Sequence, residues 1–142
     1  MAILAAVVWL QTGSDEYGRD AGPEPGSGRV ALTPGVIEQA FERRESDVLV
    51  LGRGRVVRVL EDDLDGARHQ RFVLALDSGI TVLIAHNIDI APRVGDLQIG
   101  ESVLFRGEYE WNDRGGVIHW THHDPDGIHE DGWLEYAGRR YE

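Results

Sequence analysis

The sequence contains no cysteine, no lysine and only one methionine. Without cysteine, disulfides, thiolate catalysis and cysteine-based zinc fingers are excluded. A metal site would therefore have to be built from histidine and carboxylate side chains. That donor set suits a divalent transition metal such as zinc, copper, nickel or iron, which is the cofactor we expect if the protein holds one.

Positive charge is also scarce. The sequence has fourteen arginines and twenty-five acidic residues, which gives a formal net charge of −11. Proteins that track nucleic-acid phosphates usually carry a basic footprint, so we do not expect nucleic acid to be a partner. The 142 residues, 42% of them hydrophobic and 27% charged, fit one soluble globular domain.

Long hydrophobic runs are missing as well. The unbroken apolar segment 2–10 has about half the ~20 residues that a membrane-spanning helix needs, so no stable membrane span is expected. Its length fits the core of an export signal, although no basic residue precedes it. The alternative is a first strand or helix of the folded domain. We expect a degraded export signal followed by a flexible linker to residue 30, hence a periplasmic or secreted protein with its domain at 31–142.

Helical spacing is confined to residues 34–44. Thr33 is placed to cap the first-turn amides, and Pro34 suits the first helical position. The apolar residues share one face: Val36, Ile37, Ala40 and Phe41. This pattern predicts a short packing helix.

From Val48 onward the hydrophobic period is two. It predicts strands at 48–60, 69–76, 80–86, 101–111 and 116–123, with a bend or bulge in the first strand at Gly52 or Gly54. Five strands with a long bent first one resemble the oligonucleotide/oligosaccharide-binding (OB) barrel. Trp133 to Tyr141 alternates across a two-residue turn, as in a hairpin, and its aromatic residues are suited to cover a barrel end. The expected fold is all-β: a five-stranded OB-like barrel with a short N-terminal helix and a C-terminal hairpin.

Four of the six histidines fall between His119 and His129. Imidazole transfers protons and binds metals near neutral pH, so this cluster of histidines indicates acid–base catalysis or metal binding. Strand alternation to His123 would direct His122 inward and His119, Thr121 and His123 outward. His119 and His123 would then lie ~13 Å apart along the strand, too far to share an ion.

The sequence Asp124-Pro125-Asp126-Gly127 is typical of a type I turn that reverses the chain. The reversal would place His129 opposite His122 or His123, because cross-strand neighbours lie ~5 Å apart. We therefore predict a metal site formed by His122, His123, His129 and Asp124. The alternative is that these histidines only donate to carbonyls and acidic neighbours at a polar barrel end.

A second candidate site lies around the ends of the second and third strands. The predicted ligand-binding residues there are Arg68, His69, Arg71, His86 and Asn87. The preceding acidic loop, with Asp62, Asp63 and Asp65, could hold a hard cation, although its spacing differs from the calcium-loop pattern. Asn87 could instead only bond the local backbone and shape the turn. On the fourth strand, Arg106 and Glu108 are expected to form a solvated surface pair.

Several motifs occur in order along residues 45–142. They are Asp62-Asp63…Gly66…Arg68-His69-Gln70-Arg71-Phe72, Ala85-His86-Asn87-Ile88-Asp89…Pro92-Arg93, Gly107-Glu-Tyr-Glu-Trp-Asn112 and Gly115-Gly-Val-Ile-His119-Trp-Thr-His-His123-Asp124-Pro125. Together they resemble a bacterial family of small, usually exported proteins of unknown function. The resemblance implies an extracytoplasmic location and says nothing about mechanism.

The leading functional hypothesis is an exported OB-fold module that binds a small ligand or metal at its His/Asp-rich end. One alternative is a metal-dependent hydrolase of the phosphodiesterase or nuclease type, working through the acidic loop or the histidines. The other is a structural or protein-interaction module. A fold of this kind hosts binders and enzymes alike, so the site must decide between these hypotheses.

Overall fold

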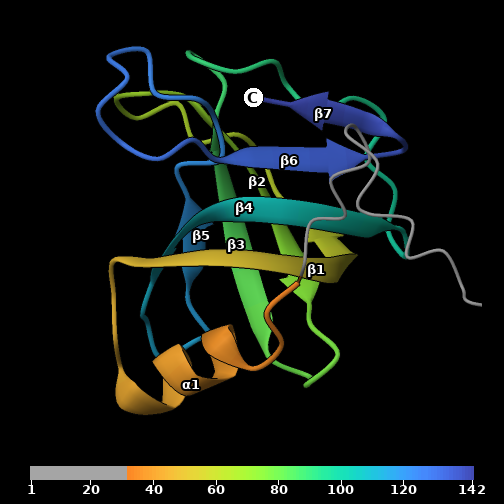
Figure 1. Ribbon diagram of the computed structural model, residues 1–142. Helices are drawn as coiled ribbons and strands as arrows, with labels where there is room; N and C mark the ends of the chain where they lie inside the picture. The colour runs from red at the N-terminus through yellow and green to blue at the C-terminus, as the bar shows by residue number, and fades with distance from the viewer. Residues whose placement is uncertain (1–31) are drawn as a thin grey trace, which may run out of the picture. The chain divides into compact units, whose positions relative to one another are not determined.

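The computed structural model describes residues 32–142, and the predictions on residues 1–31 lie outside this range. Helix α1 (Val36–Arg43) comes first (Figure 1). Seven strands follow it within the described residues: β1 (Val48–Val59), β2 (His69–Ala75), β3 (Thr81–Asn87), β4 (Ser102–Glu110), β5 (Val117–His119), β6 (Trp133–Tyr136) and β7 (Arg139–Tyr141). In this part of the chain, no helix is long and apolar enough to cross a membrane.

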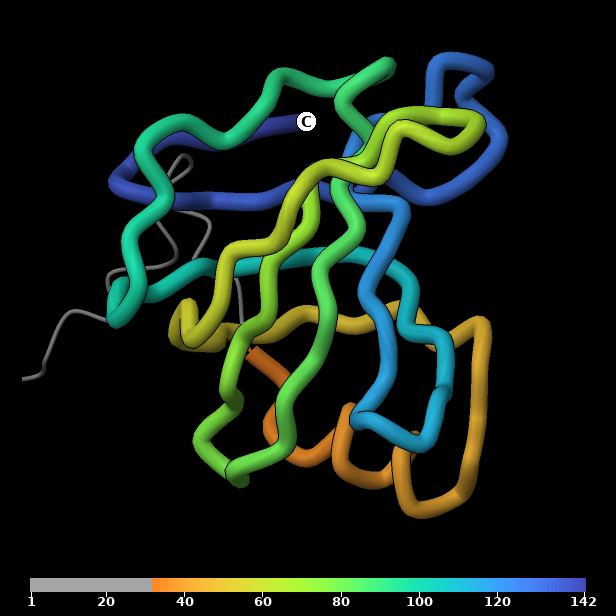
Figure 2. The backbone as a smooth tube through the Cα atoms, turned by 180° about the vertical axis from the view of Figure 1, so that it is seen from behind, coloured from red at the N-terminus to blue at the C-terminus, as the bar shows by residue number. Residues whose placement is uncertain are grey.

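The first five strands close into a barrel. Their order is β1-β2-β3-β5-β4, and β4 pairs back with β1. The contact between β3 and β5 is parallel, and the others are antiparallel. Figure 2 shows β2, β3 and β5 side by side, as seen from behind. This arrangement confirms the predicted five-stranded barrel, the short helix and the hairpin.

The core forms because β2, β3 and β4 each turn alternate residues inward. Phe72, Ile84, Phe105 and Tyr109 are fully buried at its centre. Gln70 also points inward, and its amide exchanges two hydrogen bonds with the backbone of Val94. The long β3–β4 connection is thereby fixed to one end of the barrel, since a buried amide left unpaired would be costly.

Strand β1 contains a bulge, as expected, but the bulge lies beyond Gly52 and Gly54. Gly52 allows close packing, because a Cβ there would lie 2.5 Å from the Phe105 ring. The register with β2 shifts between Val56 and Arg58, so Val57 is the extra residue. The strand therefore pairs regularly with β4 through Gly52 and Gly54, meets β2 at Arg55 and bulges at Val57.

The start of α1 differs from the prediction. The N-cap residue is Gly35, with φ of 84°, and no side chain caps the helix, so the predicted Thr33 cap is wrong. The left-handed turn at Gly35 delays the helix to Val36, and α1 packs on the barrel through buried Ile37 and Ala40. Trp111 donates its indole N–H to the Phe41 carbonyl and holds the helix against the end of β4.

The C-terminal hairpin extends β4. Strand β6 pairs with β4 from Val103 to Arg106, and β7 pairs with β6. Ala137 and Gly138 both have positive φ, as a tight two-residue hairpin turn requires. Tyr136 is buried and donates its hydroxyl proton to the Asp96 carbonyl, which ties the hairpin to the β3–β4 connection.

Candidate functional site

Strand β5 is shorter than predicted and ends at His119. Trp120 follows with φ of 55°, a left-handed conformation that is strained for a bulky residue. The kink breaks the inward–outward alternation of side chains that the sequence predicts up to His123. Thr121, predicted to point outward, is buried, whereas His122 is buried as predicted and His123 is exposed.

Buried His86 at the end of β3 explains why Thr121 turns inward. Its Nε2 lies 2.9 Å from the Pro92 carbonyl, which can only accept a hydrogen bond, so Nε2 carries the proton. Its Nδ1, 2.7 Å from Thr121 Oγ1, then accepts from that hydroxyl. Burial lowers the pKa of the His86 imidazole. His86 is thus a neutral link between three segments at the barrel end.

The other predicted ligand-binding residues surround the same strand ends. His69 on β2 lies opposite Asn87 on β3. Arg68 donates its backbone N–H and its Nε to the Asp89 carboxylate, at 2.9 and 2.7 Å, which lowers the pKa of that carboxyl. Asn87 Oδ1 accepts from the Asp89 N–H, as the local alternative expected.

Arg71 and the acidic loop are likewise engaged within the protein. Arg71 donates to the Glu61 carbonyl, Asp62 pairs with Arg93, and Asp63 accepts from the Asp65 backbone. The residues predicted for this site are therefore adjacent, and most of their polar groups bond to the protein itself. Their role in ligand binding stays a prediction.

The chain reverses at Asp124–Gly127, as expected, with a hydrogen bond from the Gly127 N–H to the Asp124 carbonyl. The Asp124 carboxylate accepts three backbone N–H bonds, from Asp126, Ile128 and His129, at 2.6 to 2.9 Å. These bonds lower the pKa of Asp124. Its charge is used to shape the turn.

Trp120 contacts the rings of both His122 and His129, with centroid distances of 4.8 and 4.1 Å. His122 Nδ1 donates to the His123 carbonyl at 2.7 Å. His129 Nδ1 donates to the Glu130 carbonyl at 2.7 Å, and Nε2 lies 2.9 Å from Glu108 Oε2. The carbonyl of Glu130 and the carboxylate of Glu108 raise the pKa of His129. These are contacts of the kind that the polar-rim alternative describes.

A different group meets the geometric requirement for a metal centre. One donor atom from each of Glu108, Glu110 and His119 lies within 4.8 Å of the others, and no other such group of three occurs within residues 32–142. His122, His123, His129 and Asp124 do not form such a group, so their role as a metal set stays a prediction. Both glutamates point outward from β4, and the antiparallel register places His119 on β5 opposite Glu108.

Sequence reasoning missed this group for two reasons. It assigned Glu108 to a surface pair with Arg106, but Arg106 instead binds Glu130, at 2.8 Å, and the Asp131 carbonyl. The sequence prediction also combined the histidines with Asp124 in the following turn, and not with the glutamates of the preceding strand. The available signal was two glutamates at i, i+2 spacing on one strand, followed by a histidine on the same face of the next.

Trp120 marks the same region by a second feature. Its indole Nε1 is buried and has no hydrogen-bond partner among the described residues. A strained backbone and an orphaned buried donor at one residue are more frequent near functional sites than elsewhere. Because Trp120 stacks on His129, both features lie beside Glu108.

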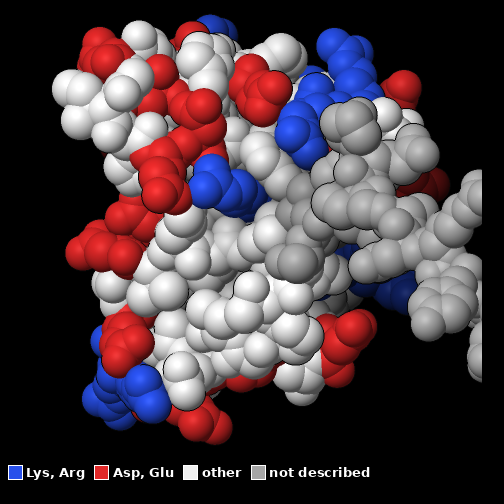
Figure 3. All heavy atoms as spheres, viewed as in Figure 1, with Lys and Arg blue, Asp and Glu red and all other residues white. Residues whose placement is uncertain are grey.

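A surface hollow of about 360 Å³ adjoins this group. Its lining residues are Asp47, Leu49, Glu108, Ile128, His129 and Glu130. Figure 3 shows acidic side chains gathered on the side of the molecule where β5 and the loop after it lie. A negatively charged surface of this kind attracts cations.

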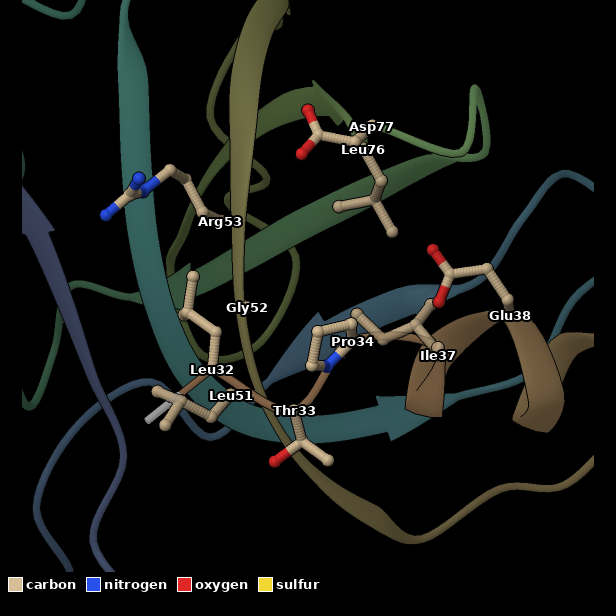
Figure 4. A pocket seen from close by; sticks show the side chains of 11 residues that line it. Leu32, Thr33, Pro34, Ile37, Glu38, Leu51, Gly52, Arg53, Leu76 and Asp77 are labelled. Atoms are coloured by element: carbon tan, nitrogen blue, oxygen red, sulfur yellow. The ribbon is translucent and has the colours of Figure 1, made fainter. Parts of the chain in front are cut away.

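A smaller cavity, of about 170 Å³, lies between the start of α1 and β1. Figure 4 shows Leu32, Pro34, Ile37 and Leu76 around it. No histidine lines this cavity, and neither do any of the predicted site residues. We therefore place the candidate site on the outer face of β4 and β5.

No curated protein and no solved structure matches this chain. A family model described as "Protein of unknown function (DUF3465)" matches residues 29–142, which include the whole barrel and the hairpin. The chain belongs to this DUF3465 family of proteins of unknown function.

Proposed function

We propose that this protein binds a divalent transition metal ion such as Zn²⁺ on the outer face of β4 and β5. The observation that carries the proposal is the convergence of Glu108, Glu110 and His119 donor atoms to within 4.8 Å. Two ligands each ~2.1 Å from one ion are at most ~4.2 Å apart, so small side-chain rotations would close the site. His119 Nε2 and Glu110 Oε1 are already 3.3 Å apart.

His129 positions Glu108 in this proposal. Its Nε2 donates to Glu108 Oε2 and leaves the other carboxylate oxygen for the metal. Hydrogen bonds to metal-bound carboxylates fix their orientation, and losing such a partner typically costs 10–100-fold in affinity. The predicted involvement of His129 is kept here, in a different role.

The site opens to solvent, since the His119 and Glu110 side chains are 38% and 36% exposed. Three protein ligands leave a coordination position for water, as in catalytic rather than structural zinc sites. This opening and the hollow beside Glu108 favour metal-dependent hydrolysis as the second candidate function. Its test is hydrolysis of bis(p-nitrophenyl) phosphate with Zn²⁺ and its loss in Glu110→Gln.

Calorimetric titration of the metal-free protein with ZnCl₂ tests the main proposal. We expect one ion per chain, with affinity reduced at least tenfold in Glu110→Gln and in His119→Ala. His129→Ala should weaken binding less than either. Glu135→Gln is the matched control, because Glu135 is also a strand glutamate paired with a basic side chain, Arg140, and should bind as the parent does.

Two outcomes would overturn it. If Glu110→Gln and His119→Ala both bind Zn²⁺ with the affinity of the parent, the ion does not bind on this face of β4 and β5. Loss of binding in His122→Ala and His123→Ala, with Glu110→Gln unaffected, would instead assign the ion to the set predicted from sequence. Circular dichroism of each variant separates loss of a ligand from loss of the fold.

We also propose that the protein is exported. The support is the apolar segment 2–10 ahead of a Gly-, Ser- and Pro-rich stretch. Fusing residues 1–30 to alkaline phosphatase lacking its own signal tests this, because that enzyme gains activity only outside the cytoplasm. An inactive but intact fusion would reject export through this segment.

A further inference from the structure

A groove of about 490 Å³ lies over β1, β2, β3 and the β4–β5 connection, and none of the proposed metal ligands lines it. Small-molecule sites usually enclose ~300–1,000 Å³ with a mainly apolar lining and a few placed polar groups. The residues that matter here are Val57, Arg58, Val73, Thr81, Leu83 and Arg114.

The bulge in β1 builds one wall of this groove. Val56 is buried in the core, and Arg58 pairs with Val73, so the extra residue Val57 is displaced toward the outer face. Val57 and Arg58 therefore line the groove together. Val57 is left 42% exposed, next to the apolar side chains of Val73 and Leu83. Bulges often re-aim side chains at functional sites.

Two arginine side chains without a partner among the described residues lie beside this apolar surface. Arg58 and Arg114 make no side-chain hydrogen bond or ion pair with any residue from 32 to 142, whereas Arg68, Arg93 and Arg106 all pair with carboxylates. Asn112 Oδ1 accepts from the backbone N–H groups of Arg114 and Gly116 and so fixes the turn that presents Arg114.

The strands around the groove carry positive and no negative side chains. β1 has three arginines, β2 has one, and β1, β2 and β3 contain no aspartate or glutamate. In a chain of net charge −11, these three strands carry no acidic residue, and the one acidic residue between Asn112 and Arg114 in the β4–β5 connection, Asp113, is not among those that line the groove. An anionic ligand would meet complementary charge here.

We propose that this groove binds a small amphipathic anion, whose apolar body lies on Val57, Val73 and Leu83 and whose carboxylate, sulfonate or phosphate group meets Arg58 and Arg114. No aromatic side chain lines the groove. Since nucleobases are held mainly by aromatic stacking, the lining disfavours single-stranded nucleic acid. The proposal does not depend on the metal site, which lies on β4 and β5.

Two matched fluorescent probes test this site in the full chain. Anilinonaphthalene sulfonate carries an anionic group, and N-phenyl-1-naphthylamine has the same aromatic body without it. We expect saturable binding of the sulfonate, weakened at least fivefold in the Arg58→Gln/Arg114→Gln double variant. Binding of the neutral probe should change less than twofold.

Arg53→Gln is the control variant, because Arg53 also lacks a side-chain partner among residues 32–142 but lies outside this groove. It should leave the binding of both probes unchanged. Val73→Gln should weaken both probes, because it removes part of the apolar floor. Near-ultraviolet circular dichroism confirms that each variant keeps its tertiary structure.

Absence of saturable sulfonate binding would overturn the proposal, and so would equal affinity in the double arginine variant. Tighter binding of a dT12 oligonucleotide than of the sulfonate at physiological salt would replace the small anion with nucleic acid. Zinc titration of the double variant should match the parent, so failure here is separable from failure of the metal proposal.

Discussion

His129 Nε2 lies 2.9 Å from Glu108 Oε2 and joins the loop after β5 to the outer face of β4. The bond from Nδ1 to the Glu130 carbonyl and the nearby carboxylate raise the pKa of His129. We predict that NMR titration finds a His129 pKa above the usual value, and that Glu108→Gln lowers it. An unchanged pKa in Glu108→Gln would show that the pair does not form in solution.

The pH dependence of this pair has a definite sign. Since the folded-state pKa of His129 is raised, its stabilisation is fully present below the unfolded-state value near 6.5. It is lost as pH rises through the folded-state pKa. Urea unfolding of the parent and of His129→Gln should therefore differ more at pH 5.5 than at pH 8.5.

His86 should matter more for stability than any exposed histidine. Replacing it with alanine removes both hydrogen bonds, leaves Thr121 and the Pro92 carbonyl without their partner, and opens a cavity. We expect a loss of about 2–4 kcal/mol in the free energy of unfolding. His123→Ala, at an exposed position, should change it by less than about 0.5 kcal/mol.

The His86 contribution should depend on pH in the opposite sense to that of His129. Burial lowers its folded-state pKa, so the unfolded chain binds the proton first as pH falls below 6.5. Stability therefore decreases through that interval and recovers as pH rises. If the parent and His86→Gln lose stability equally between pH 6.5 and 4.5, the ring is not held neutral.

Two glycine-to-alanine variants test how closely β1 packs on the core. Gly52→Ala would place a Cβ 2.5 Å from the ring of Phe105, which is fully buried. We expect a loss of about 1–3 kcal/mol, measured by chemical denaturation. Gly95→Ala is the control, because nothing lies within 4 Å of its Cβ position. Equal stability of the two variants would show that β1 does not pack as described.

Nucleic acid should bind weakly. The net charge of −11 repels phosphates, and the arginines are interspersed with acidic residues outside β1 to β3. Fluorescence anisotropy with labelled DNA and RNA at physiological salt should give no tight complex. Tight binding with a steep salt dependence would contradict this expectation.

The barrel strands were predictable because each central strand has one face in the core. On β2 the inward residues Phe72 and Leu74 alternate with the outward residues Arg71, Val73 and Ala75, and this period of two predicts burial on one face. The Asp124–Gly127 turn was predictable for a local reason, the preference of proline and glycine for fixed turn positions.

The end of β5 was not predictable from local preferences. Trp120 adopts a left-handed backbone that its residue type disfavours, and a distant segment holds it there. Gly132 donates its N–H to the His122 carbonyl, and its missing side chain leaves room for the Trp120 carbonyl. The sequence shows Glu108, Glu110 and His119 on neighbouring strands, but the pairing of Glu108 with His119 depends on how the β4–β5 connection turns, which sets the register.

The β3–β5 contact has a consequence for how the chain folds. Strand β5 pairs on both sides, in parallel with β3 and antiparallel with β4, so it joins the two edges of an otherwise open sheet. A chain interrupted before Val117 would expose both edges, and such edges readily pair with other molecules. β1 also pairs with β4, which lies far from it in the sequence. Because such non-local pairs must form before the barrel closes, we expect slow, all-or-none folding, with aggregation of shortened chains as the competing process.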